Sequence, residues 1–175
     1  SVPGVTIDHT RIITSDEAIG LRKVPASIVI LGSGAVGVEF ASIYRRFGSE
    51  VTIVELLPRL VPAEDEAVST ELEKSFKKQG ITVLTGTKVT KATSTPSGVT
   101  IEAQAPDGKT QTISADMLLV ATGRGPVTTG LGAEEAGHPA AEEVRVVGEV
   151  DEPAQRPGGL GGVTDEGCGL RLVAN

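Results

Sequence analysis

Residues 27–39 read Ser-Ile-Val-Ile-Leu-Gly-Ser-Gly-Ala-Val-Gly-Val-Glu, and residues 50–55 read Glu-Val-Thr-Ile-Val-Glu. The apolar run at 28–31 predicts a buried parallel strand. Three glycines follow this strand with the spacing G-x-G-x-x-G, at the point where a helix should begin. The second stretch predicts a neighbouring parallel strand. Strand, glycine-rich turn, helix and strand in this order are typical of a dinucleotide-binding unit.

The three glycines of this turn have different expected tasks. Gly32 allows the sharp change from strand to helix, and Gly37 lets the helix lie close on the sheet. Gly34 lets a pyrophosphate approach the backbone, because no Cβ stands in its way. The N–H groups of the first helical turn then face the phosphates, whose negative charge the helix dipole favours. A glycine-rich turn alone would equally suit a methyltransferase or a purely structural loop.

The acidic residue at the end of the second strand narrows the choice of cofactor. Glu55 lies about 20 residues beyond the glycines, where a carboxylate accepts hydrogen bonds from an adenosine ribose. A carboxylate at this place repels a 2′-phosphate, whereas an NADP(H) site would use Arg or Lys. The sequence therefore predicts NAD(H) as the cofactor. The alternative for Glu55 is a solvated strand end.

Composition argues against several classes of function. The 175 residues are 39% hydrophobic but include only one Tyr, three Phe and no Trp, so aliphatic side chains must fill the core. The net charge of −7 argues against a nucleic-acid partner. No apolar stretch approaches the roughly 20 residues that span a bilayer. We expect no nucleic-acid partner, no membrane partner and no metal site, and a cytoplasmic location, or the mitochondrial matrix in a eukaryote.

Apolar periodicity extends the dinucleotide-binding unit into an α/β domain. Helical spacing predicts a helix over residues 35–47, whose apolar face includes Ile43 and Phe47. A second helix is predicted over residues 64–79, with Val68 on its inner stripe. Further strands are predicted at 81–84, 88–95, 98–105, 109–113 and 116–121. The fold class is a Rossmann-like parallel sheet with helices on both faces and an antiparallel three-stranded β-meander as crossover.

Four phrases in succession carry a specific resemblance. They are Arg-Ile-Ile-Thr-Ser-Asp-Glu-Ala from Arg11, Gly-Ser-Gly-Ala-Val-Gly-Val-Glu-Phe-Ala-Ser from Gly32, Glu-Val-Thr-Ile-Val-Glu-Leu-Leu-Pro-Arg-Leu-Val-Pro from Glu50, and Leu-Val-Ala-Thr-Gly-Arg from Leu119. With these phrases the chain resembles the central NAD-binding domain of dihydrolipoyl dehydrogenase, a family of flavin-linked pyridine nucleotide-disulfide oxidoreductases. The likeness covers residues 1–135. A meander in place of the crossover helix is also that family's arrangement.

The resemblance implies a set of cofactor-binding residues and no catalytic residue in this chain. The pyrophosphate and the nicotinamide ribose would lie against Gly32, Ser33, Gly34, Ala35, Val36, Gly37, Val38 and Glu39. Glu55 would bind the adenosine ribose, Val89 would line the adenine pocket, and Gly123 would let the chain pass close to the cofactor. The alternatives are a surface or helix-dipole role for Glu39, a core position for Val89 and an ordinary strand-end turn at Gly123.

The resemblance also divides the chain. Residues 1–23 are expected to be a connector from a missing FAD domain, 24–135 the NAD-binding domain, and 136–175 a loose tail rich in Pro and Gly. In the complete enzyme the FAD domain carries a redox-active cysteine pair, and an interface domain carries a His-Glu pair that serves the partner subunit. Such enzymes are homodimers within 2-oxo acid dehydrogenase complexes. With Cys168 as its only cysteine, the chain is not expected to turn over alone.

Two departures from the family pattern leave alternatives open. Gly125 stands where the family usually has an arginine, and the sequence after Gly137 lacks the family's Ala-Ile-Gly-Asp turn. A shift of reading frame, a gene-fragment artefact and a natural flexible tail are the explanations for the second departure. Three functions remain: the NAD(H)-binding part of a dihydrolipoyl dehydrogenase that converts dihydrolipoamide and NAD to lipoamide and NADH, part of a related flavin disulfide reductase such as mercuric or glutathione reductase, or a nucleotide-binding fragment without turnover.

Overall fold

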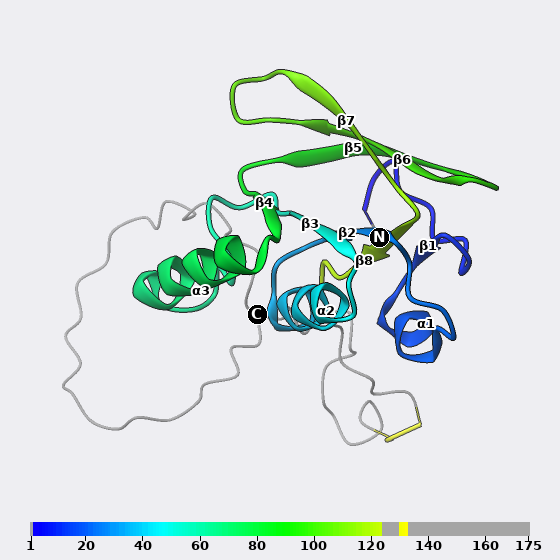
Figure 1. The fold of residues 1–175 in the computed structure, drawn as a ribbon, viewed down its shortest axis with the longest axis horizontal. Helices are drawn as coiled ribbons and strands as arrows, with labels where there is room; N and C mark the ends of the chain where they lie inside the picture. Colours follow the sequence, from blue (N-terminus) through cyan, green and yellow to red (C-terminus); the bar gives the residue numbers. More distant parts are fainter. Residues whose placement is uncertain (1, 124–129, 133–175) are drawn as a thin grey trace. The chain divides into compact units, whose positions relative to one another are not determined.

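Five parallel strands form the main sheet of the computed structural model, which describes residues 2–123 and 130–132 (Figure 1). In the order in which they lie side by side, the strands are β1 (Ile12–Ile13), β8 (Met117–Val120), β2 (Ser27–Leu31), β3 (Glu50–Val54) and β4 (Thr82–Leu84). The predicted parallel sheet is thus confirmed. The tail at 136–175, with Cys168, and the departure at Gly125 lie outside the described residues.

The central strand β2 is covered on both of its faces. Ile28, Val29 and Ile30 are each 1% exposed or less, although side chains alternate between the faces of a sheet. Ile28 and Ile30 belong to one apolar cluster and Val29 to another. A strand buried on both sides needs the unbroken apolar run that the sequence shows.

The helices of the described residues are α1 (Ser15–Gly20), α2 (Ala35–Arg46) and α3 (Glu66–Gln79), and they lie on one face of the sheet (Figure 1). Tyr44 of α2 and Phe76 of α3 pack there against apolar residues of the sheet. The sequence predicts helices on both faces, whereas within residues 2–123 the helices cover one face and the meander covers the other. No helix among the described residues is long and apolar enough to cross a bilayer.

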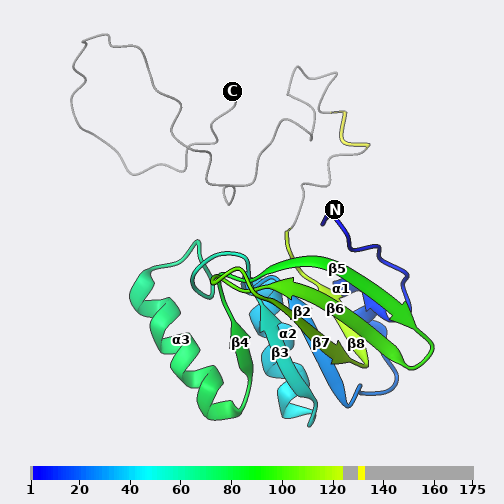
Figure 2. The same cartoon turned by 90° about the horizontal axis from the view of Figure 1, so that it is seen from above.

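The opposite face of the sheet is covered by the predicted antiparallel meander (Figure 2). Its strands are β5 (Lys88–Thr95), β6 (Gly98–Gln104) and β7 (Thr110–Ala115), paired in that order. The side chains of Val99, Ile101 and Ala103 point inward from β6 and are buried against Val29 and Leu31. Because the chain runs from β4 through this meander to β8, the meander occupies the face that a crossover helix would otherwise cover.

The segment before Val24 contributes the strand β1 to the main sheet. Ile12 and Ile13 are 2% and 1% exposed, and β1 pairs in parallel with β8, Ile12 opposite Leu118. Residues 1–23, which the sequence predicts to be a connector, thus include a strand of the main sheet. Two residues are too short for a periodic pattern, so the sequence gives no sign of this strand. The domain boundaries at 24 and 135 stay predictions.

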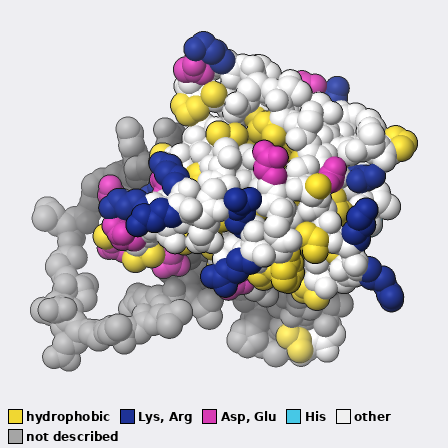
Figure 3. Space-filling model, in the orientation of Figure 1, with side chains coloured by type: hydrophobic (Ala, Val, Ile, Leu, Met, Phe, Trp, Pro, Cys, Tyr) yellow, Lys and Arg dark blue, Asp and Glu magenta, His cyan; other side chains and the backbone are white. Residues whose placement is uncertain are grey.

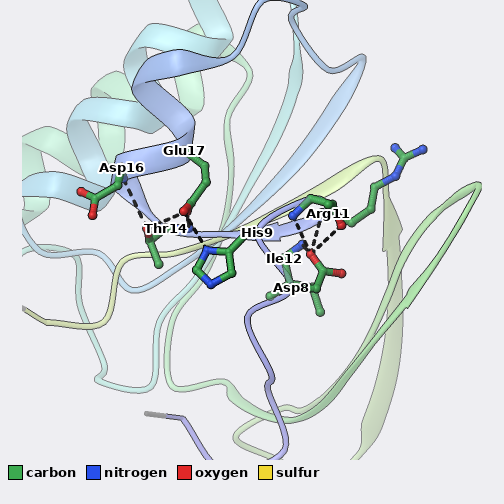
Figure 4. A network of polar contacts seen from close by, with 8 residues as sticks. Asp8, His9, Arg11, Ile12, Thr14, Asp16 and Glu17 are labelled. Atoms are coloured by element: carbon green, nitrogen blue, oxygen red, sulfur yellow. Dashed lines mark hydrogen bonds and ion pairs between the residues drawn. The ribbon is translucent and has the colours of Figure 1, made fainter.

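Helix α1 begins at Ser15, and a network of polar contacts around Thr14 fixes its start (Figure 4). Glu17 Oε2 accepts hydrogen bonds from the Thr14 N–H (2.8 Å) and hydroxyl (2.7 Å), and His9 Nδ1 lies 2.7 Å from Glu17 Oε1. The Thr14 hydroxyl also accepts from the N–H of Asp16 at 3.3 Å. The hydrogen bonds from the Thr14 N–H, from His9 and from the Thr14 hydroxyl lower the pKa of Glu17 to about 2.

Three apolar side chains that the sequence places on inner helix faces are exposed instead. Ile43 and Phe47 of the α2 region are 43% and 65% exposed, and Val68 of α3 is 54% exposed. A helix buries only a stripe of its surface, and in α2 the small Ala41 and the ring of Tyr44 fill the buried stripe. Figure 3 shows hydrophobic side chains gathered on the surface over α1 and α2.

Candidate functional site

The turn after β2 depends on Gly32. Gly32 has φ +100°, and its N–H donates to the carbonyl of Val54 at 2.9 Å. A Cβ on Gly32 would lie 2.6 Å from the carbonyl oxygen of Ala121. Both the backbone conformation and the close approach of the chain after β8 exclude other residues here. The predicted task of Gly32 is confirmed.

Gly37 sets the distance between α2 and the turn. A Cβ there would lie 2.1 Å from the carbonyl oxygen of Gly32 and 3.6 Å from Cγ2 of Ile30. The first is far below any real contact and involves backbone, which cannot move aside as a flexible side chain can. The prediction that Gly37 lets the helix pack closely is also confirmed.

Gly34 differs from Gly32 and Gly37 because nothing in the described part of the chain requires a glycine at this position. It is exposed, with φ −65° and ψ −179°, values that any residue adopts. A Cβ on Gly34 would meet no heavy atom of the described residues within 4 Å. The glycine thus leaves open a space at the start of α2 that a larger side chain would fill.

The helix that starts at this turn has no side-chain cap. Gly34 is the N-cap of α2 and offers no side-chain hydrogen bond. Ala35 is exposed, while Val36 and Val38 are half-buried. The first N–H groups of a helix have no partner within the helix, and its dipole makes this end positive. The start of α2 therefore suits an anion on geometric and electrostatic grounds.

Glu55 lies directly beside the glycine turn. It is 8% exposed and follows the last residue of β3. Its Oε2 accepts hydrogen bonds from the N–H (2.7 Å) and the hydroxyl (2.8 Å) of Ser33, and its Oε1 accepts from the N–H of Leu57 (2.8 Å). The alternative of a solvated strand end does not fit a carboxylate that is 8% exposed and accepts three hydrogen bonds.

Ser33 connects the turn to the loop after β3. Its side chain is fully buried, and its carbonyl accepts from the N–H of Val61 at 3.0 Å. Val61 has φ +41°, a conformation uncommon for a β-branched residue. The sequence places Ser33 among the cofactor-binding residues but does not show that its hydroxyl bonds Glu55.

The remaining predicted residues lie at different depths. Glu39 is exposed on α2, whereas Val89 is buried, 5% exposed, between the main sheet and the meander. The chain before Val89 touches the site, since the N–H of Thr87 donates to the carbonyl of Glu55 at 2.8 Å. Gly123 is exposed beyond β8, and a Cβ there would meet nothing within 4 Å.

The carboxyl ends of β2, β3 and β8 thus meet at one edge of the sheet, where open α/β folds bind their ligands. The structure brings together the glycine turn, the start of α2 and Glu55 at this edge. The sequence pattern of the pyridine nucleotide-disulphide oxidoreductases matches residues 1–155. The chain belongs to this family.

Relatives within this oxidoreductase family agree with the fold. A dihydrolipoyl dehydrogenase of Mycobacterium leprae is 47% identical over 136 residues, which cover 78% of this chain and 29% of the relative. The HOCl-induced flavoprotein disulfide reductase RclA of Escherichia coli is 31% identical with a TM-score of 0.64, over 78% of this chain and 30% of that protein. A water-forming NADH oxidase of Lactobacillus brevis, solved bound to NADH, is 26% identical with a TM-score of 0.60, over 73% of this chain and 28% of that one.

The chain therefore spans under a third of the length of the curated relatives that it matches, 29% for the Mycobacterium leprae enzyme. The resemblance to the central domain of dihydrolipoyl dehydrogenase, carried by the glycine turn and the phrases around it, is confirmed. In this member of the pyridine nucleotide-disulphide oxidoreductase family, the glycine turn and the buried Glu55 lie at the sheet end where open α/β folds bind ligands.

Proposed function

We propose that this chain is the NAD(H)-binding part of a flavin-dependent dihydrolipoyl dehydrogenase, which in full oxidises dihydrolipoamide to lipoamide and reduces NAD. One observation carries the proposal. Gly34 keeps an open space at the uncapped start of α2, and the buried carboxylate of Glu55 lies beside the same turn. An anion site next to a fixed acceptor matches the pyrophosphate and ribose of a dinucleotide.

Each part of the cofactor has a proposed place in this chain. The pyrophosphate would lie over Gly34 and accept hydrogen bonds from the N–H groups of Ala35 and Val36. Glu39, one turn into α2 and exposed, would reach the nicotinamide-side ribose. The remaining glycines of the turn shape it, since Gly32 and Gly37 allow its close packing.

The adenosine end would lie at the carboxyl end of β3. Glu55 would accept hydrogen bonds from the ribose hydroxyls there. Val89 would support the adenine pocket from the core, and Gly123 would leave room for the cofactor beyond β8. The carboxylate of Glu55 repels a 2′-phosphate, because two negative charges meet where water is partly excluded. NAD(H) is thus the proposed cofactor rather than NADP(H).

The flavin and the redox-active disulfide of the full enzyme are proposed to lie on residues outside this chain. The single glycine fingerprint is assigned to NAD, and Cys168 cannot form a disulfide within the chain. When bound, NAD would accept a hydride. The proposed setting of the full enzyme, supported by its likeness to dihydrolipoyl dehydrogenases, is a homodimer within 2-oxo acid dehydrogenase complexes in the cytoplasm, or in the mitochondrial matrix of a eukaryote.

A related flavin disulfide reductase is the second candidate. The likeness to RclA at 31% identity supports it, since the two folds agree over 78% of this chain. A nucleotide-binding fragment without turnover is the third, supported by the single cysteine. Sequencing the flanks of the gene separates these candidates, because an adjoining region with a cysteine pair would favour an enzyme.

Calorimetric titration of the purified 175-residue chain with NADH, and separately with NADPH, tests the proposal. We expect NADH to bind and NADPH to bind more weakly. Equal affinity for the two cofactors would contradict the assigned role of Glu55, and binding of neither would contradict the proposed function of the chain.

A further inference from the structure

The two carboxylate oxygens of Glu55 accept different numbers of hydrogen bonds from the described residues. Both hydrogen bonds to Oε2 come from Ser33, one from its N–H at 2.7 Å and one from its hydroxyl at 2.8 Å. Among the described residues, Oε1 accepts only the N–H of Leu57, at 2.8 Å. A carboxylate oxygen offers about two acceptor positions. Within residues 2–123 the two bonds from Ser33 thus fill the positions of Oε2, and one position of Oε1 is left without a donor.

The hydroxyl of Ser33 serves this single contact. Ser33 is fully buried, and its hydroxyl makes one hydrogen bond among the described residues, the bond to Glu55. The backbone N–H of any residue at position 33 could supply the other bond. The side chain therefore adds what the backbone alone cannot, a second donor to the same oxygen.

The backbone of Ser33 is itself held in place. Its neighbour Gly32 is fixed by the bond to Val54, and its own carbonyl accepts from Val61. The backbone on either side of Ser33 is thus held by hydrogen bonds that do not involve its hydroxyl. A donor on so rigid a turn restricts the rotation of the carboxylate.

We propose that Ser33 is a positioning residue that sets the cofactor preference of this site, an inference that rests on the proposed function. Its hydroxyl holds Oε2 against the glycine turn, so that Oε1 keeps its free acceptor position for a ribose hydroxyl. A carboxylate held in this way cannot turn aside to admit a 2′-phosphate. Ser33 acts on the preference between NADH and NADPH through Glu55.

A double-mutant cycle on the full 175-residue chain tests this inference. Wild type, Ser33→Ala, Glu55→Ala and the double variant are titrated with NADH and with NADPH. We expect Ser33→Ala to weaken NADH binding about fivefold, as the loss of one ordered hydrogen bond predicts. NADPH binding should change less than twofold, so the preference narrows. In the Glu55→Ala background, Ser33→Ala should have almost no further effect.

Ser49→Ala is the matched control. Ser49 is also fully buried, and its hydroxyl donates to the carbonyl of Pro25 at 2.7 Å. It precedes β3, whereas Glu55 follows it, so Ser49 lies at the opposite end of that strand. Its loss removes a buried hydroxyl without touching the site and should leave the ratio of NADH to NADPH affinity unchanged.

The outcomes separate the inference from the proposed function. If wild type prefers NADH but Ser33→Ala weakens both cofactors equally, or adds fully to Glu55→Ala, the positioning role is wrong and the NAD assignment stands. If wild type binds neither cofactor, the proposed function is wrong, and the inference with it. Circular dichroism checks folding. If Ser33→Ala does not fold, Ser33→Cys, which keeps a weak donor, should give a smaller narrowing of the preference.

Discussion

The helices α2 and α3 begin in opposite ways. Asp65 caps α3, its carboxylate accepting the N–H of Ala67 at 2.8 Å, and Thr14 with Glu17 closes the start of α1 in a similar way. α2 begins at Gly34 with no side-chain cap. Side chains thus cap the starts of α1 and α3, whereas no side chain of the described residues caps the start of α2. This difference marks the start of α2 as the proposed binding end.

The largest expected effect on stability is that of a change at Gly37, which lets α2 pack closely against the glycine turn. Gly37→Ala should lower the free energy of unfolding by about 3 kcal/mol, because its Cβ would lie 2.1 Å from a backbone oxygen. Urea unfolding followed by circular dichroism measures this. Gly34→Ala is the matched control and should cost less than about 1 kcal/mol, since its Cβ meets nothing. Equal losses for the two variants would remove the distinction between them.

A larger side chain at Gly34, the N-cap of α2, should fill the space at the start of this helix. Gly34→Val should abolish NADH binding, because the side chain fills the space proposed for the pyrophosphate. The fold should remain, since a Cβ on Gly34 has no atom of residues 2–123 within 4 Å. Calorimetric titration and circular dichroism on the same sample measure the two effects. Binding that survives this change would place the phosphates elsewhere.

A change at the capped start of α3 should have the opposite result, a loss of stability without a loss of NADH binding. Asp65→Ala should destabilise the chain by about 1 kcal/mol through loss of the cap, and it should leave NADH affinity unchanged. Thermal unfolding and titration with NADH measure the two quantities. A loss of affinity as large as that of a change in the glycine turn would argue against a binding site confined to α2.

The smallest effect concerns the cap of α1 and depends on pH. The pKa of Glu17 is lowered from its ordinary value of 4.5 to about 2, so the cap stabilises the fold fully above about pH 4.5. This contribution is lost as the pH falls through about 2, where the folded carboxylate gains its proton. The melting temperature of wild type should fall more than that of Glu17→Gln between pH 5 and pH 2. Parallel curves would show that the cap contributes nothing.

The sequence predicts those parts of the fold that repeat a pattern. The glycine spacing locates the turn, the apolar run at 28–31 locates the central strand, and the strands predicted at 88–95, 98–105 and 109–113 locate the meander. The periodicity does not show which face of the sheet the helices cover and which face the meander covers. A strand buried on both faces has the same apolar run whichever layer lies on each face. The exposure of Phe47 is not predicted for a related reason. Spacing shows which residues share a helix face, but it does not show how much of that face a neighbouring element covers.

For the candidate site the limit lies elsewhere. Residue type and spacing indicate Gly34 and Glu55, because a pyrophosphate and a ribose need those properties at that distance. The bond between the Ser33 hydroxyl and Oε2 depends on a side-chain rotamer within a closed core. Such a bond has no period and no fixed spacing, so only the coordinates show it.

The short strand β1 also bears on where this domain can be cut. It covers the edge of β8, whose Leu118 N–H donates to the carbonyl of Arg11 at 2.8 Å. A chain trimmed to begin at Val24 would leave the apolar β8 as an uncovered edge, with free backbone groups ready to pair with another molecule. A strand two residues long is a poor template for such pairing, so β1 protects the domain from aggregation as well as completing its sheet.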